Sequence, residues 1–446
     1  MAGSSDKKVR PLLIAEGANP TLTSASLVGW SCASAIARKT NAHIVTHWRN
    51  RDDFLGAGLV EGEDFTAIDT RRIQNIAWKA TRLLSPGDQF SWSLYAAFSN
   101  LVYPAFERAL WDTLGDRIKS GEFDLVHRIL PLSPTTPSPL ARKLKAHGIP
   151  FLLGPLNGGV PWPKGFDQIR KEENDRGGSL RPFYRFLPGA RAARKHSSGI
   201  LVGSRATLRE MPRSLHSKCI FLPENAIDTG RFPLTPRSPR EPGPLRIAFV
   251  GRLVALKGVD MLIEAALPLL QEGRLELDVI GDGPARESLT RQLAGAGLDP
   301  AGILAGWVEH GSLQDRLSRA DLFAFPSIRE FGGGAVLEAM ALGVSPVVLD
   351  HGGPPELVPP GAGHILPLDN RESIVSNLRQ LFQQYLDDPS PLASLGKAAQ
   401  EHIRDHLTWE AKTNQILEVY DWLLRPAHEG EAAAKPDWGT PLGWDR

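Results

Sequence analysis

Cysteine is scarce in this sequence: of its 446 residues two are cysteines, Cys32 and Cys219. Two thiols exclude a disulfide framework and a cysteine-rich zinc site, and they fit a reducing compartment. Long apolar runs are also missing, since no stretch approaches the ~18 uninterrupted apolar residues of a membrane span. We therefore expect a cytoplasmic protein, with peripheral contact at the inner face of a membrane as an open alternative.

An excess of charge of one sign is absent too. Lysine and arginine total 51 against 50 acidic residues, a net charge of +1, which excludes a strongly basic nucleic-acid binder. A hydrophobic content of 42% excludes wholesale disorder. At about 100–200 residues per domain, the length is most simply divided into two domains.

Short apolar runs alternate with longer helical patterns, which is typical of parallel sheets wrapped by helices. The expected strands are residues 12–15, 43–46, 125–129, 150–153, 199–202, 246–250, 276–280, 322–325 and 346–349. The expected helices are residues 27–39, 139–147, 258–270, 285–294, 335–341 and 372–386. In such sheets ligands bind beyond the carboxyl ends of the strands.

A proline-rich stretch, residues 229–244, separates these elements into two series. Proline disfavours both strand and helix there, so we interpret the stretch as a linker. The sequence thus predicts an α/β protein with two doubly wound, Rossmann-like domains, residues 1–228 and 245–407, and a cleft between them. The tail, residues 430–446, is polar and rich in small residues, and we expect it to be loosely ordered.

Two cations follow the first expected strand of the second series. Arg252 and Lys257 lie in a loop that begins at Gly251 and ends where a helix starts. Cations beside a helix amino terminus form a receptor suited to a diphosphate. The alternative is a pair of solvated surface charges.

Two glutamates, Glu330 and Glu338, flank a run of three glycines that ends in Gly333 and Gly334. The pattern places Glu330 on a loop and Glu338 in the first turns of the next helix. Glycine amides near the helix start can face an anion or a sugar hydroxyl, and carboxylates accept hydrogen bonds from adjacent hydroxyls. The pair therefore predicts recognition of a polyol, against the alternative of one exposed and one helix-capping glutamate.

Together these motifs resemble the C-terminal domain of the retaining GT-B-fold glycosyltransferases of family 4, the glycosyl transferases of group 1. The resemblance covers roughly residues 245–425 and rests on Arg252 with Lys257, residues 281–284, 306–308 and 326–327, Glu330 with Glu338, and residues 352–356. It implies transfer of a sugar from a nucleotide diphosphate sugar to an acceptor. The implied site consists of Arg252, Lys257, Gly333 and Gly334 at the diphosphate, Glu338 at the ribose, Glu330 at the sugar as a catalytic residue, and Gly306, Trp307 and Val308 near the base. The resemblance also implies that a helix at residues 408–425 crosses back to the first domain.

The N-terminal half resembles the family in residues 124–128, a strand that carries a histidine, and in the glycine-rich strand end 151–159. By this resemblance His127 is catalytic, and the alternative is a core histidine. Asn157 and Gly158 would belong to an acceptor or phosphate loop. Ser24 and Ser26, after the first strand, either donate to a phosphate or acceptor group or cap the following helix.

The hypothesis is a retaining glycosyltransferase that uses a UDP- or GDP-sugar and a saccharide or lipid-linked acceptor in bacterial polysaccharide or glycoconjugate biosynthesis. No cofactor and no metal are expected, because the nucleotide sugar is a substrate and no Asp-x-Asp motif occupies the usual position. Glu330 either contacts the sugar or acts as a nucleophile. The alternatives are a nucleotide-sugar epimerase of the same architecture and a non-catalytic protein that binds sugar nucleotides.

Two segments are candidates for the acceptor side. Residues 78–111 are rich in aromatic side chains, which form either a helix face packed on the first sheet or a lipid- or sugar-contacting surface. Residues 181–195 combine basic and aromatic residues without an acid, which suits either an anionic membrane surface or a solvated face.

Overall fold

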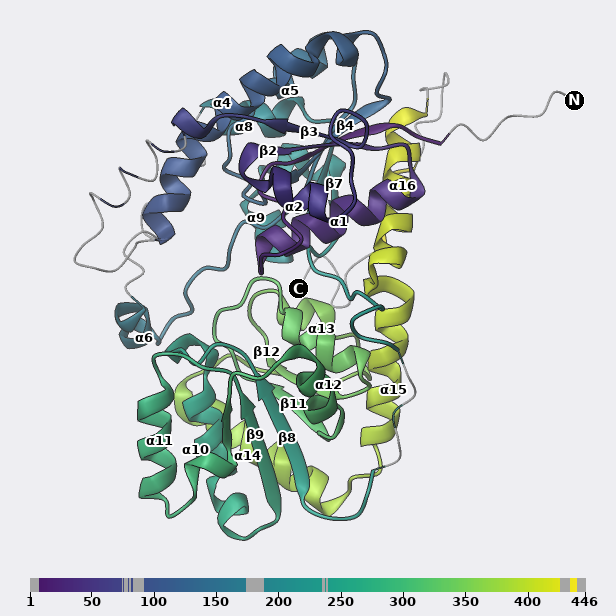
Figure 1. The fold of residues 1–446 in the computed structure, drawn as a ribbon. Coiled ribbons are helices and arrows are strands. Elements are labelled where there is room, and N and C mark those ends of the chain that lie inside the picture. The colour runs from purple at the N-terminus through teal and green to yellow at the C-terminus, as the bar shows by residue number, and fades with distance from the viewer. Residues whose placement is uncertain are drawn as a thin grey trace, which may run out of the picture. The chain divides into compact units, whose positions relative to one another are not determined.

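The computed structural model describes residues 8–73, 75, 79, 82, 92–173, 188–234, 237, 240–425 and 434–438; of residues 92–101, 188 and 310 it describes the backbone alone. These residues form two compact units (Figure 1). The N-terminal unit contains the described residues up to 158, from 188 to 224 and from 412 to 438. The C-terminal unit contains residues 159–173 and those described between 225 and 411.

The N-terminal unit is built on a parallel sheet of seven strands within the described residues. Their order across the sheet is β3 (Phe65–Ile68), β2 (His43–His47), β1 (Pro11–Ala15), β4 (Leu125–Leu130), β5 (Phe151–Leu156), β6 (Gly199–Val202) and β7 (Cys219–Phe221). All but β3 are buried along their whole length. Burial along the whole length is typical of parallel strands that are covered on both faces.

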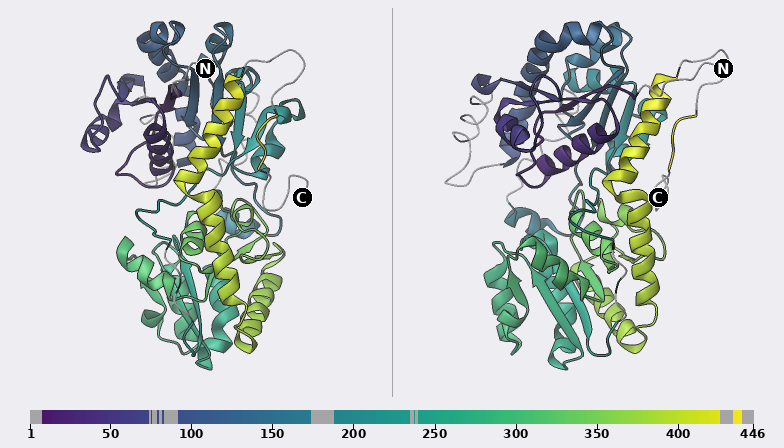
Figure 2. Two further views of the ribbon diagram at one scale, coloured as in Figure 1. Left: turned by 90° about the vertical axis from the view of Figure 1, so that its right-hand side faces the viewer. Right: turned by 45° about the vertical axis from the view of Figure 1, so that its right-hand side comes forward.

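Helices connect these strands. They are α1 (Ala25–Lys39), α2 (Arg51–Gly56), α4 (Trp92–Lys119), α5 (Leu140–Ala146), α8 (Pro188–His196) and α9 (Arg205–Glu210), with the short helices η1 (Trp48–Asn50) and η3 (Arg213–Lys218). Gly29 lets α1 approach β4 closely, because a Cβ there would lie 2.2 Å from a methyl carbon of Leu130. The long helix α16 (Trp409–Leu424), yellow in Figure 2, contributes Tyr420 to this unit's core.

The C-terminal unit repeats the same topology with a parallel sheet of six described strands. Their order is β10 (Leu304–Gly306), β9 (Leu275–Ile280), β8 (Leu245–Val250), β11 (Leu322–Phe325), β12 (Ser345–Leu349) and β13 (His364–Leu366). The helices are α6 (Asp167–Glu172), η4 (Ala255–Lys257), α10 (Val259–Gln271), α11 (Arg286–Gly295), η5 (Pro300–Gly302), α12 (His310–Ser318), α13 (Gly334–Ala341), η6 (Pro354–Leu357), α14 (Arg371–Asp387), α15 (Leu392–His402) and η7 (Ile403–Leu407).

One apolar core joins this second sheet to its helices. The inner strands β8, β11 and β12 pack against α10, α13 and α14, whose apolar positions are buried. In a parallel sheet of this order the loops that follow the inner strands converge at one edge. The core therefore fixes the loops after β8, β9, β11 and β12 next to one another.

The α/β fold with two doubly wound sheets is the one that the sequence predicts, and all nine predicted strands are present. The sequence did not predict β3, β7, β10 and β13. These four form the outer edges of the two sheets and have three or four residues each. A short edge strand carries a weaker apolar signal, since it has a neighbour on one side only.

The unit boundaries differ from the predicted division near residue 228. Residues 159–173 lie in the N-terminal half of the sequence but pack with the C-terminal unit, and so do the residues from 225 onward. Ile227, for example, exchanges backbone hydrogen bonds with Leu407 and Trp409 at 2.8 and 3.1 Å. In the predicted loose tail, residues 434–438 make contacts: Lys435 donates to the Cys219 carbonyl at 2.7 Å.

Within the described residues, no helix combines the length and the apolar character that crossing a bilayer requires.

Candidate functional site

The cationic loop after β8 places Lys257 at the carboxyl edge of the sheet. Lys257 ends η4, and Gly258 follows with a φ of 69°. A Cβ on Gly258 would lie 2.3 Å from the Pro326 carbonyl oxygen, so glycine lets this loop pack on the loop after β11. The Lys257 side chain is 16% exposed, and burial lowers its pKa to about 8, with Glu173 acting in the opposite direction.

Glu330, on the loop after β11, receives the Lys257 ammonium in an ion pair. Its other carboxylate oxygen accepts from the backbone amide of Phe331 at 3.0 Å. The ammonium also lies 5.0 Å from the centre of the Phe325 ring. The structure therefore brings together two residues that the sequence assigns to the diphosphate and to the sugar.

Arg252, the other predicted diphosphate ligand, is exposed. Its guanidinium forms no hydrogen bond or ion pair with another residue in the part of the chain that the structure describes. It lies on the same loop as Lys257, five residues before it. An exposed cation of this kind is available to an anionic ligand.

Glu338 lies in the second turn of α13 and is half-buried. Burial raises its pKa to about 7, and the nearby Arg231 opposes this shift. Among the described residues no side chain or amide donates a hydrogen bond to its carboxylate. A desolvated carboxylate without a donor is costly, which favours a ligand that supplies hydroxyl groups.

The glycines at the strand ends hold these loops against one another. A Cβ at Gly281 would lie 1.9 Å from the Gly251 carbonyl oxygen, and one at Gly353 would lie 1.8 Å from that of Phe331. Gly353 also donates its amide to the Glu330 carbonyl at 3.1 Å. The glycines thus allow loop-on-loop packing, which fixes the position of Glu330.

Gly333 adopts a φ of 57° just before α13, and Gly334 is the first residue of the helix. Gly334 is exposed, and a Cβ there would meet little besides the Asn225 amide at 3.9 Å. The amides at this helix start have no intrahelical acceptor, as at any helix amino terminus. That these amides face an anion stays a prediction.

The predicted base region follows β10. Gly306 has a φ of 76°, and Trp307 after it is 75% exposed. Arg286 supports this turn by donating to the Leu304 carbonyl at 3.2 Å. Val308 is half-buried. The turn therefore presents a large aromatic face to solvent beside the carboxyl edge of the sheet.

His127 has the surroundings of a core histidine, one of the two alternatives that the sequence leaves open. Its side chain is 0% exposed. Nδ1 lies 2.7 Å from the Tyr420 hydroxyl and Nε2 lies 2.7 Å from the Gly154 carbonyl oxygen. Burial lowers its pKa to about 4. Both nitrogens are engaged, so His127 presents none to a ligand in this structure.

The loop that contains Asn157 and Gly158 is held from three sides within the N-terminal unit. The Asn157 amide group donates to Glu224 at 2.6 Å, and its backbone amide donates to the Leu132 carbonyl at 2.8 Å. The Gly158 amide donates to the Thr207 hydroxyl at 2.8 Å. No motif in the sequence points to Glu224, which is buried; burial raises its pKa.

Ser24 does not cap α1 with its side chain, so the capping alternative is wrong for this residue. Its φ of 59° is the one positive value among the described non-glycine residues. Ser26 is half-buried in the first turn, and its carbonyl accepts from the Asn19 amide at 3.0 Å.

The two candidate acceptor segments are described in part. Residues 78, 80–81, 83–91 and 181–187 and the side chains of 92–101 lie outside the described residues. Within the described part of α4, Tyr103 and Phe106 are 5% and 1% exposed, which fits the packed helix face. Arg194 is also buried and donates to the Pro134 carbonyl at 2.8 Å.

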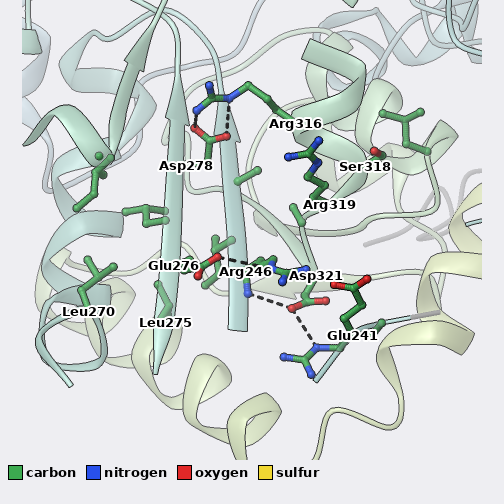
Figure 3. A pocket seen from close by; sticks show the side chains of 18 of the residues that line it. Glu241, Arg246, Leu270, Leu275, Glu276, Asp278, Arg316, Ser318, Arg319 and Asp321 are labelled. Atoms are coloured by element: carbon green, nitrogen blue, oxygen red, sulfur yellow. Dashed lines mark hydrogen bonds and ion pairs between the residues drawn. The ribbon is translucent and has the colours of Figure 1, made fainter. Parts of the chain in front are cut away.

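A cavity of about 1080 Å³ lies at the opposite, amino edge of the C-terminal sheet (Figure 3). Two ion pairs lie in its lining: Arg316 donates to both Asp278 oxygens at 2.7 and 2.8 Å, and Arg240 lies 3.1 Å from Asp321. Ligands of such folds bind at the carboxyl edge, so we do not assign the donor to this cavity.

No group of three or more histidine, cysteine, aspartate or glutamate side chains within the described ranges is arranged to hold a metal ion. Metal independence stays a prediction.

Known proteins resemble this chain in sequence and in fold. Residues 244–384 match the family model described as glycosyl transferases group 1. The chain is 32% identical over 259 residues to the GDP-mannose-dependent monoacylated alpha-(1-6)-phosphatidylinositol monomannoside mannosyltransferase of Corynebacterium glutamicum, across 52% of this chain and 65% of that protein. It is 32% identical over 216 residues to the glycogen synthase of Mycobacterium tuberculosis, across 48% and 50%. The chain thus spans between 50% and 65% of the length of these two relatives.

Solved structures show the same fold over nearly the whole chain. HepE of Anabaena in complex with UDP matches 93% of this chain and 99% of its own, with a TM-score of 0.59 and 15% identity. A glycosyltransferase from Rickettsia africae matches 94% and 100%, with a TM-score of 0.60 and 14% identity. The two doubly wound units therefore form the GT-B fold. Within the C-terminal unit, residues 244–384 are similar to the glycosyl transferases of group 1.

Proposed function

We propose that this chain is a retaining glycosyltransferase that moves a sugar from a UDP- or GDP-linked donor to a saccharide or lipid-linked acceptor. The contact between Lys257 and Glu330, with Glu338 on the helix that follows, carries the proposal. A diphosphate needs a cation, and a sugar and a ribose each need a hydrogen-bond acceptor. These three groups occupy one edge of the C-terminal sheet.

In this proposal the diphosphate binds Arg252, Lys257 and the amides at Gly333 and Gly334. The bond between the anomeric carbon and the diphosphate oxygen breaks, and negative charge develops on the leaving group, where fixed cations stabilise it. The acceptor oxygen bonds to the anomeric carbon on the same face, and its proton passes to the leaving diphosphate. Arriving phosphate competes with Glu330 for the Lys257 ammonium, so Glu330 is released toward the sugar.

In this same-face step Glu330 accepts hydrogen bonds from the sugar hydroxyls. The alternative is a double displacement, in which the Glu330 carboxylate bonds to the anomeric carbon from the opposite face as the diphosphate leaves, and the acceptor oxygen then displaces the carboxylate and loses its proton to the departed diphosphate. Glu338 accepts hydrogen bonds from the ribose hydroxyls, which its lack of a donor among the described residues supports. The exposed ring of Trp307 supports contact with the base. His127 has no step in this mechanism, since both of its nitrogens are engaged inside the N-terminal unit.

The names of similar proteins support the donor class. The Corynebacterium relative is named as GDP-mannose-dependent, and HepE was solved with UDP. We extend this to a metal-independent reaction in the cytoplasm, within bacterial polysaccharide or glycoconjugate biosynthesis, without a separate cofactor.

Calorimetric titration of the full chain with UDP, GDP, UDP-glucose and GDP-mannose tests the proposal. One nucleotide and the corresponding nucleotide sugar should bind. Lys257→Ala should weaken the binding of both ligands, whereas Lys397→Ala should weaken the binding of neither. Lys397 is the matched control because it is an exposed lysine of α15 in the same unit. Binding of no nucleotide in this set would contradict the proposal.

Mass spectrometry detects loss of the sugar from the donor, and proton NMR detects a change of sugar stereochemistry at constant mass, so the two together separate the outcomes that share the fold. Release of nucleoside diphosphate with loss of the sugar supports transfer or its hydrolytic side reaction. A donor that changes its sugar stereochemistry without losing the nucleotide indicates an epimerase. A donor that stays unchanged with every acceptor indicates a protein that binds sugar nucleotides without catalysis.

A further inference from the structure

Residues 159–173, called here the donor arm, connect the N-terminal sheet to the donor loops. They follow β5 and Asn157 and Gly158 directly, yet they pack with the C-terminal unit. Val160 and Phe166 are 2% and 5% exposed, and Phe166 belongs to the apolar core of the C-terminal unit. Helix α6 of the arm, labelled in Figure 1, contacts η4, the short helix that carries Lys257.

The donor arm holds Arg329, the residue before Glu330. The Arg329 guanidinium carbon lies 4.7 Å from the centre of the Trp162 ring and 5.5 Å from that of Phe331. Its Nε donates to the Val160 carbonyl oxygen at 2.8 Å. A guanidinium held by two aromatic rings and a carbonyl has little freedom to turn. The backbone of Glu330 is therefore fixed from the arm.

A second attachment joins the arm to the glycine loop after β12. The ring nitrogen Nε2 of His351 lies 2.9 Å from the Pro161 carbonyl oxygen. Two residues further, Gly353 donates its amide to the Glu330 carbonyl at 3.1 Å. The loop that carries Glu330 and the loop after β12 that packs against it are thus both anchored to residues 160–162.

We propose that the donor arm sets the position of Glu330 for the donor sugar, with Trp162 and Arg329 as positioning residues. This inference rests on the proposed function, because it assigns the sugar to Glu330. Through Trp162 and Arg329 the arm acts on the carboxylate that meets the sugar, whereas its contact with η4, which carries Lys257, is made by α6. It therefore determines how much affinity the sugar adds to the nucleotide.

The test compares the dissociation constants of UDP with UDP-glucose and of GDP with GDP-mannose. For the pair that the wild-type chain binds, Trp162→Ala and Arg329→Gln should weaken the nucleotide sugar about tenfold and the nucleotide about twofold or less. Trp162→Phe keeps an aromatic ring under the guanidinium and should retain most of the sugar affinity. Arg71→Gln is the matched control, since Arg71 lies 3.6 Å from the Trp48 ring centre in the N-terminal unit, and it should change neither constant.

Equal losses for nucleotide and nucleotide sugar, or no loss for either, would overturn the positioning role while the proposed function stands. Wild-type chain that binds none of the four ligands would contradict the proposed function instead. Hydrogen exchange then tests the arm alone: Trp162→Ala should accelerate exchange at the amides of Phe331 and Gly353, which are hydrogen-bonded at 3.0 and 3.1 Å. Unchanged exchange at both amides would overturn the inference without any ligand.

Discussion

His127 on β4 and Tyr420 on α16 are hydrogen-bonded, with 2.7 Å between Nδ1 and the hydroxyl, although 293 positions separate them in sequence. Both side chains are 0% exposed. The bond attaches the C-terminal helix to a central strand of the N-terminal sheet. A histidine that the family resemblance makes catalytic therefore stabilises the packing of α16 in this chain.

Tyr420→Phe should lower the free energy of unfolding by about 1–3 kcal/mol, because it leaves a nitrogen of a buried histidine without a partner. Urea denaturation of the full chain measures this loss. Tyr385→Phe is the comparison, because it removes the same kind of hydrogen bond in the C-terminal unit, where the Tyr385 hydroxyl lies 2.6 Å from Nε2 of His364. Neither variant should change nucleotide affinity. A Tyr420→Phe chain that keeps its stability but loses turnover would restore a catalytic role for His127.

Glu338→Gln should remove the pH dependence of nucleotide binding near neutrality. Burial raises the pKa of Glu338 to about 7, so the carboxylate protonates as the pH falls below that value and loses acceptor capacity for the ribose. Wild-type affinity for UDP or GDP should therefore decrease from pH 8 to pH 6. Titration calorimetry at several pH values checks this. A glutamine variant that keeps the same pH profile would assign the dependence to another group.

The same raised pKa has a consequence for stability. An acid with a higher pKa in the folded than in the unfolded chain stabilises the fold below its ordinary value of 4.5, and this stabilisation is lost as the pH rises through about 7. Glu338→Gln should therefore raise the melting temperature at pH 8 and change it little at pH 5. A variant that melts earlier at pH 8 would mean that the carboxylate has a stabilising partner.

The inner strands could be predicted because a strand covered on both faces is a continuous apolar run, as in β1 and β12. The edge strands could not, since β13 is half-buried throughout its three residues. Lys257 and Glu330 could be identified by their positions after strands, because parallel strands bring such loops to one edge. Their mutual contact could not, since it depends on how two loops 73 residues apart pack together.

The roles of His127 and Trp162 show where sequence patterns lose information. The local sequence around a histidine in a buried strand is the same whether its nitrogens contact a ligand or a tyrosine far along the chain. Trp162 lies in a loop rich in glycine and proline, where no periodicity shows which unit it will join. Its contact with Arg329 follows from tertiary packing alone.

Gly353→Ala should displace the Glu330 loop, because the added Cβ would lie 1.8 Å from the Phe331 carbonyl oxygen. Such overpacking costs about 1–3 kcal/mol of stability. Affinity for the nucleotide sugar should fall with it. Thermal denaturation and donor titration measure the two effects. Gly302→Ala is the control, since nothing lies within 4 Å of a Cβ there. Equal behaviour of the two variants would contradict tight loop packing.

Lys257→Ala and Arg252→Ala should weaken UDP or GDP about tenfold or more and leave uridine or guanosine nearly unchanged, since a charge-assisted contact to phosphate contributes about 1.5–3 kcal/mol. Of the two, Lys257→Ala should also reduce stability, because it leaves the half-buried Glu330 carboxylate without its cation, whereas Arg252 is exposed. Paired titrations with nucleotide and nucleoside, together with melting curves, separate these effects. Arg319→Ala serves as the control for Arg252, being an exposed arginine at the opposite edge of the same sheet. If nucleotide and nucleoside weaken equally in Lys257→Ala, the ammonium supports the fold of the loop and does not bind the diphosphate.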